Sequence, residues 1–270
     1  VIFDTLSNIF KYLMKMKRLP IVILMVVAAS FLAFNSMGKS TRSLPPGNYE
    51  KIMKLVGEML SQGHYSPQSI NDAFSKKVFK KFVTDLDPDK NIFLQSDIDA
   101  LKKFENKVDD EVKGAIVEFP LAAGKIFNKR VEESSVLYNE ILSSAFDFTV
   151  NEEVLLDADQ VGFTVNATEQ KERWRKKLKF MTLERYADLL ESREKNKGKE
   201  GFVVKTDEEL EKDARERVKK IMDRTFERYR FKFNDDDKFN MYVNAITTTM
   251  DPHTEFFPPV DKRYFDEEMS

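Results

Sequence analysis

The sequence contains no cysteine and only two histidines, His64 and His253, so thiol nucleophiles are absent and imidazole bases are scarce. A histidine titrates near neutral pH and can act as a general base. Neither has a nucleophile to activate, because the sequence lacks a Gly-x-Ser-x-Gly motif and a thiol. We predict that His253 caps or packs a turn and that His64 ends a helix, where its charge complements the helix dipole. Without thiolates or a His-x-x-x-His pair, we expect no zinc site, and we predict no cofactor.

Oxygen-bearing side chains in one acidic segment have spacings like those of calcium ligands: Asp87, Asp89, Asn91, Asp97 and Asp99. A calcium loop of the EF-hand type requires glycine at its sixth position and a bidentate glutamate at its twelfth. Those positions hold Ile92 and Ile98, which disfavours a calcium site. The other interpretation is a turn in which Pro88 ends one helix and Ser96 caps the next.

A basic run in residues 171–179 has six cations in nine positions around Trp174. It could attract an anionic partner. We favour a solvated helix face with Trp174 and Leu178 turned to the core. The whole chain has 44 basic and 46 acidic residues, and this balance argues against a nucleic-acid surface. The three aspartates at 235–237 fit the N-terminus of a helix.

These residues are expected to lie on or between helices. No proline occurs between residues 121 and 251, and residues that favour helices are plentiful there. One helix is predicted to begin with Ser66 as its N-cap and Pro67 in its first turn. Apolar residues with helical spacing follow at Ile70, Phe74, Val78, Phe82 and Leu86, and again at Leu210, Ala214, Val218, Ile221 and Phe226. Thr206 and Glu209 form a capping-box pattern ahead of the second set.

Two stretches interrupt the helical pattern. Residues 148–150 and 161–165 are β-prone and indicate a loop with a small strand pair, and residues 196–204 read as a Gly/Lys linker. The predicted fold is mainly α, an irregular multi-helix domain over residues 45–250 with a small β pair.

The N-terminal residues predict export. We expect residues 1–18 to form a basic leader region, with the true start at Met14 or Met16 and residues 1–14 not translated. Residues 19–38 contain sixteen uncharged residues (19–34) and then small polar ones, the layout of a signal peptide. An uncleaved membrane anchor is the alternative, although sixteen helical residues span only about 24 Å of a roughly 30 Å hydrocarbon core.

Residues 251–270 predict a linker. Asp251-Pro252 ends a helix, since proline lacks an N–H and disfavours α conformation in the residue before it. An aromatic, doubly prolyl turn follows at Phe256, Phe257, Pro258 and Pro259, and then an acidic segment. We expect the linker to lead to a further domain outside this sequence.

Five ordered blocks carry a family resemblance. The last comprises Asp251-Pro252-His253-Thr254, the aromatic pair, Pro259, Phe265 and Glu268-Met269-Ser270. The others are Phe74-Ser75-Lys76-Lys77-Val78-Phe79, Leu86-Asp87-Pro88-Asp89 with Phe93-Leu94-Gln95-Ser96-Asp97-Ile98, Phe146-Asp147-Phe148-Thr149, and Trp174-Arg175-Lys176-Lys177-Leu178-Lys179. Over residues 49–270 the chain resembles the N-terminal region of tail-specific proteases, or carboxy-terminal processing peptidases, up to the approach to their PDZ domain.

The resemblance implies the helical platform of a periplasmic serine protease with a Ser/Lys dyad. No dyad residue falls within this sequence, so we assign no catalytic position. Asp251, Pro252, His253, Thr254, Phe256, Phe257 and Pro259 are expected to dock the platform against the PDZ domain. The implied partners are the protein's own PDZ and protease domains, substrates with accessible C-termini and a lipoprotein adaptor. The alternative is a membrane-anchored, non-enzymatic helical binding or scaffold protein.

Overall fold

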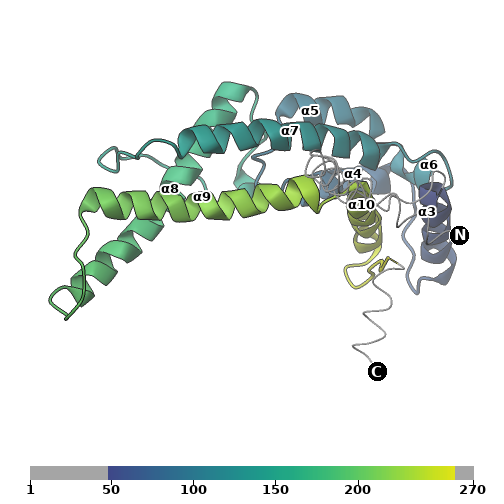
Figure 1. The fold of residues 1–270 in the computed structure, drawn as a ribbon. Helices are drawn as coiled ribbons and strands as arrows, with labels where there is room; N and C mark the ends of the chain where they lie inside the picture. Colours follow the sequence, from purple (N-terminus) through teal and green to yellow (C-terminus); the bar gives the residue numbers. More distant parts are fainter. Residues whose placement is uncertain (1–47, 259–270) are drawn as a thin grey trace, which may run out of the picture. The chain divides into compact units, whose positions relative to one another are not determined.

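The computed structural model describes residues 48–258, which belong to the compact unit Leu44–Ser270 (Figure 1). The helices there are α3 (Asn48–Glu58), α4 (Asp72–Leu86), α5 (Gln95–Leu101), α6 (Val108–Val112), α7 (Phe119–Ile141), α8 (Ala167–Asn196), α9 (Asp207–Phe231) and α10 (Asp235–Met250), with short turns η1 (Met59–Gly63), η2 (Lys102–Phe104) and η3 (Ala158–Gln160). The predicted mainly helical fold is confirmed. The leader, the signal peptide or anchor, and Pro259 lie outside the described residues. No helix in residues 48–258 is long and apolar enough to cross a membrane.

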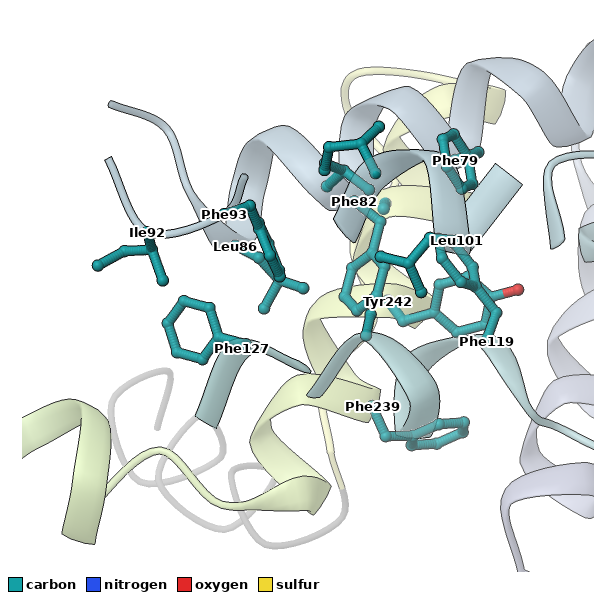
Figure 2. Packing of buried hydrophobic residues seen from close by; sticks show 14 of the residues in the cluster. Phe79, Phe82, Leu86, Ile92, Phe93, Leu101, Phe119, Phe127, Phe239 and Tyr242 are labelled. Atoms are coloured by element: carbon teal, nitrogen blue, oxygen red, sulfur yellow. The ribbon is translucent and has the colours of Figure 1, made fainter. Parts of the chain in front are cut away.

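Aromatic rings form the centre of the core, between α4, α7 and α10 (Figure 2). Phe82 lies edge-on to Phe119 with ring centroids 5.3 Å apart, and Phe119 lies edge-on to Tyr242 at 5.6 Å. All three side chains are fully buried. Edge-to-face contacts are the favoured geometry for aromatic pairs. They join three helices that are far apart in the sequence.

The two longest helices of the described residues, α8 and α9, pack against each other, and α7 contacts both (Figure 1). Trp174 and Leu178 of α8 are buried, as the spacing predicts. On α9 the predicted Ile221 is 37% exposed and Met222 is buried in its place. The buried positions thus continue every fourth residue from Val218 to Met222, which is the other position that the 3.6-residue period allows.

Two predicted helix starts are wrong, while a third is confirmed. α4 begins at Asp72 because Asn71 is its N-cap and accepts the N–H groups of Ala73 and Phe74. α5 begins at Gln95 rather than after Ser96, since the Asp97 carboxylate accepts the Leu94 N–H. Ser66, Ser69 and Asn71 all precede α4 and are good capping residues, so local sequence does not choose between them, whereas the N-cap of α5 is Leu94, which capping preferences disfavour. The Thr206–Glu209 capping box of α9 is present as predicted.

The predicted strand pair is also wrong, because residues 148–150 and 161–165 form no strand. Thr164 makes only an isolated parallel bridge with Leu94. Lysine side chains satisfy carbonyls that a partner strand would otherwise bind: Lys179 donates to Val150, and Lys90 donates to Ala158 and Val161. A β-prone sequence has no reason to pair when side-chain donors already reach its backbone.

The contact between α3 and α6 leaves no room for a side chain at Gly57. A Cβ there would lie 2.5 Å from Val112 Cγ1 and 2.6 Å from Val112 O. We expect Gly57→Ala to lower the free energy of unfolding by about 1–3 kcal/mol, measured by urea denaturation, because the two helices must move apart. The matched control is Gly63→Ala, where a Cβ meets nothing within 4 Å. Equal stability of the two variants would contradict the close approach.

Candidate functional site

A tight turn follows α10 at the predicted linker. The Asp251 N–H still donates to Thr247 O, but Pro252 cannot continue the helix. Asp251 Oδ1 then accepts the His253 N–H at 2.7 Å, and the Thr254 N–H donates to Asp251 O at 3.0 Å. The chain therefore leaves α10 in a fixed direction.

Side chains of the segment before α4 form hydrogen bonds with this turn. Tyr65 Oη donates to Asp251 Oδ2 at 3.1 Å, and Thr254 Oγ1 lies 3.3 Å from His64 Nε2. Gln68 Nε2 donates to Met250 O at 2.7 Å, so it satisfies a carbonyl at the helix end. Residues 186 positions apart in the sequence are thus linked.

The contacts at the turn also shift the pKa values of Asp251 and Tyr65. The His253 N–H, the Tyr65 hydroxyl and the nearby imidazoles of His253 and His64 lower the pKa of Asp251. The hydrogen bond to Asp251 raises the pKa of Tyr65 in return. Asp251 is consequently a carboxylate at neutral pH, as acceptance of both hydrogen bonds requires.

A second pair of hydrogen bonds holds the linker at Phe256. Asn244 Oδ1 accepts the Phe256 N–H at 2.7 Å, and Asn244 Nδ2 donates to Phe256 O at 3.1 Å. The amide side chain therefore pairs with both backbone groups of one residue, as a neighbouring strand would. Phe256 packs partly buried against the core, whereas Phe257 is 52% exposed.

Sequence reasoning selected the linker but missed the residues that hold it. The two backbone groups of Phe256 meet Asn244, and Tyr65 and Gln68 reach Asp251 and Met250. No local pattern marks these three polar residues, since their partners are distant in sequence or on the opposite side of a turn. His64 ends η1 as predicted. His253 contributes its backbone N–H while its side chain is exposed.

The acidic segment after α4 is a buried turn. Asp87 Oδ1 accepts the Asn91 N–H, and Oδ2 accepts the N–H groups of Ile92 and Phe93, at 2.8–3.0 Å. Burial raises the pKa of Asp87 to about 6 against the opposing effect of these bonds. The geometry supports the turn interpretation, since N–H groups occupy the oxygens that a cation would need. In residues 48–258 no group of three or more potential ligands could hold a metal ion.

The basic run on α8 is largely paired within the protein. Lys171 bonds Glu140 at 2.8 Å, while Arg175 and Lys179 both bond Glu152. These two cations lower the pKa of Glu152 to about 2. Trp174 beside them is buried, which supports the solvated-face interpretation.

Comparison with known proteins identifies the helical domain. A family model described as the tail-specific protease N-terminal domain matches residues 56–260. The chain belongs to this family. The tail-specific protease of Haemophilus influenzae is 23% identical over 212 residues, which cover 78% of this chain and 28% of that relative. The chain therefore spans little more than a quarter of the curated relative that it matches.

The family resemblance found in the sequence is thus confirmed. The matched region of the tail-specific protease N-terminal domain ends at residue 260, two residues beyond the described part of the linker. The segment Asp251 to Pro258 accordingly lies at the C-terminal end of the region that matches the family.

Proposed function

We propose that this chain is the N-terminal helical platform of an exported serine protease that degrades or trims proteins from their C-termini. The PDZ domain and the Ser/Lys dyad would lie in sequence outside this chain. Membership of the tail-specific protease N-terminal domain family and the name of the similar protease support this proposal. The alternative, a membrane-anchored scaffold without enzymatic activity, is an outcome of the test below.

The observation that carries the proposal is that two sets of hydrogen bonds hold the linker in place. Asn244 bonds the N–H and the C=O of Phe256, and Gln68 and Tyr65 hold the end of α10. A fixed exit direction limits the positions of the next domain, so a substrate end bound there would be presented to the protease at a constant place. Such positioning raises rates because orientation is settled before the reaction.

The partners and location follow from the same proposal. Substrates would be exported or envelope proteins with accessible, apolar C-termini, and a lipoprotein adaptor would deliver some of them. The protein would act on the periplasmic side of a bacterial inner membrane, with residues 19–38 either cleaved as a signal peptide or kept as an anchor. The absence of cysteine is compatible with an oxidising compartment.

The test uses the longer protein and the variant Asn244→Ala. We expect kcat/KM for a C-terminally tagged substrate to fall on the order of tenfold, since the linker loses both bonds at Phe256. Hydrogen exchange of the Phe256 amide should accelerate in the same variant, because its acceptor is gone. Cleavage is measured by loss of the tag on gels.

The matched control is Asn240→Ala, one turn earlier on α10, where the side chain makes no hydrogen bond to any described residue. It should leave cleavage unchanged. Replacing residues 250–259 by a flexible linker should reproduce the loss. Unaltered cleavage in that protein would rule out the docking role, and a longer protein without any peptidase activity would leave the scaffold alternative.

A further inference from the structure

Tyr65 presents an aromatic ring to solvent beside the point where the linker begins. The residue is 85% exposed, the highest value among the exposed large hydrophobic and aromatic residues in the described part of the chain. Single exposed hydrophobic residues are common on protein surfaces and need no explanation. Tyr65 differs from such residues because its ring is held in place.

Contacts at both ends of the side chain fix this ring. The Tyr65 hydroxyl donates to Asp251 Oδ2 at 3.1 Å, and the ring centroid lies 4.9 Å from that of His64. The imidazole of His64 is itself held, since its Nδ1 accepts the Ser66 N–H at 3.2 Å and its Nε2 lies 3.3 Å from Thr254 Oγ1. A ring that is already ordered loses little conformational entropy when a partner covers it. Tyr65 therefore has the properties of an anchor residue in a protein interface.

The linker presents a second aromatic side chain, that of Phe257, which is 52% exposed. Asn244 holds the preceding residue through both of its backbone groups, so the linker is fixed relative to α10 at this point as well. One ring thus comes from the segment before α4 and the other from the linker. Aromatic side chains are enriched in protein interfaces because each of them buries a large area.

The continuity of the chain indicates what covers these rings. The turn at Asp251 gives the linker a fixed direction, so the polypeptide that follows Pro258 begins close to Tyr65 and Phe257. The matched region covers only 28% of the tail-specific protease of Haemophilus influenzae. A domain joined by a short linker has a high effective concentration at the surface where the linker begins, which a separate partner lacks. The occupant that these observations favour is the domain after the linker.

We propose that the ring of Tyr65, together with Phe257, forms the surface of the helical platform on which the domain after the linker packs. The inference rests on the function proposed above, which places a folded domain after the linker. It adds a contact from a segment 186 residues before the Asp251 turn. The platform would then hold the next domain directly, and the direction of the linker would not be the only constraint on its position.

The first test compares the hydroxyl-radical footprints of this chain and of the longer protein, read by mass spectrometry. We expect the oxidation rate of Tyr65 to fall on the order of fivefold in the longer protein, because an interface core excludes solvent. The matched control is Phe231, which is 77% exposed and ends α9 just before α10 begins, whereas the linker follows the end of α10. Its oxidation rate should be the same in both proteins. Unchanged oxidation of Tyr65, or equal protection of both rings, would overturn the proposal.

The second test separates the ring of Tyr65 from its hydroxyl. The variants Tyr65→Ser and Tyr65→Phe of the longer protein are digested with trypsin, which cleaves after Lys262 and Arg263. Proteolysis follows the population of the open form, so Tyr65→Ser should accelerate cleavage there on the order of tenfold. Tyr65→Phe keeps the ring and should accelerate cleavage by less than about twofold. Equal acceleration in the two variants would mean that only the hydrogen bond to Asp251 matters, and the docking surface would be refuted.

The outcomes distinguish this docking surface from the proposed function. If a longer protein cleaves tagged substrates while Tyr65 stays exposed, the surface is wrong and the function stands. If Tyr65 is protected in a longer protein without peptidase activity, the surface stands and the protease function is wrong. Protection of Tyr65 in this chain alone at high concentration would assign the ring to a contact between two copies, and that result would also overturn the proposal.

Discussion

Asp87→Ala is expected to lower the free energy of unfolding by about 3–6 kcal/mol at pH 7, among the largest losses from a single side chain in this domain. The variant leaves three buried N–H groups, those of Asn91, Ile92 and Phe93, without an acceptor. Each such group costs about 1–3 kcal/mol when its partner is removed. The cost of burying the charge, seen in the raised pKa of Asp87, offsets part of the loss. Urea denaturation measures the difference.

The control for this variant is Asp89→Ala two residues later. The Asp89 side chain is 64% exposed and, among the described residues, forms an ion pair only with Lys177 at the surface, so its removal should cost less than about 1 kcal/mol. If both variants lost a similar free energy of unfolding, the negative charge of the segment would matter and the hydrogen bonds of the buried turn would not.

Local patterns predicted the parts of the fold that depend on local physics. The spacing of Phe74, Val78 and Phe82 gives the buried face of α4, and Thr206 with Glu209 gives the start of α9. Asp251-Pro252 gives the end of α10. In each case the determining contact lies within about four residues, and sequence spacing alone therefore specifies it.

Predictions failed where a distant side chain decided the outcome. Residues 148–150 and 161–165 were predicted to form a strand pair, but Lys179 and Lys90 donate to the carbonyls of Val150 and Val161 from other elements. Ser66 was an acceptable N-cap by type, yet Gln68 draws that segment to the end of α10, and Asn71 caps α4. The linker shows the same limit. Its own residues were recognisable in the sequence, but Asn244, which bonds Phe256 from twelve residues away, was not.

Glu111 of α6 joins three helices in one buried cluster. Its Oε1 accepts the N–H groups of Glu118 and Phe119 at the start of α7, at 2.9 and 3.0 Å. Its Oε2 accepts the hydroxyl of Tyr242 on α10 at 2.7 Å. Burial raises the pKa of Glu111 above its ordinary value, against the lowering effect of these three bonds. Burial and the nearby carboxylate also raise the pKa of Tyr242.

Glu111→Ala is therefore expected to cost about 3–5 kcal/mol at pH 7, since two N–H groups and a buried hydroxyl lose their acceptor. Glu111→Gln should cost much less. Its oxygen can still accept from Glu118 and Phe119, and its amide nitrogen can donate to Tyr242 Oη. Urea denaturation of both variants beside the parent chain measures the difference. Equal losses in the two would mean that volume, rather than hydrogen bonding, makes Glu111 necessary.

The glutamine variant should also change how stability depends on pH. Because the folded-state pKa of Glu111 is raised, its contribution is fully present below the ordinary pKa of 4.5 and is lost as pH rises through the folded value. The parent chain should thus lose stability above pH 4.5 with a slope of at most about 1.4 kcal/mol per pH unit from this group. Asp87 acts with the same sign up to about pH 6 and should remain in Glu111→Gln. The difference between parent and variant should therefore change with pH across that window. Parallel stability curves from pH 4 to 8 would show that Glu111 titrates normally, and the cost of burying its carboxylate would then be offset by its three hydrogen bonds.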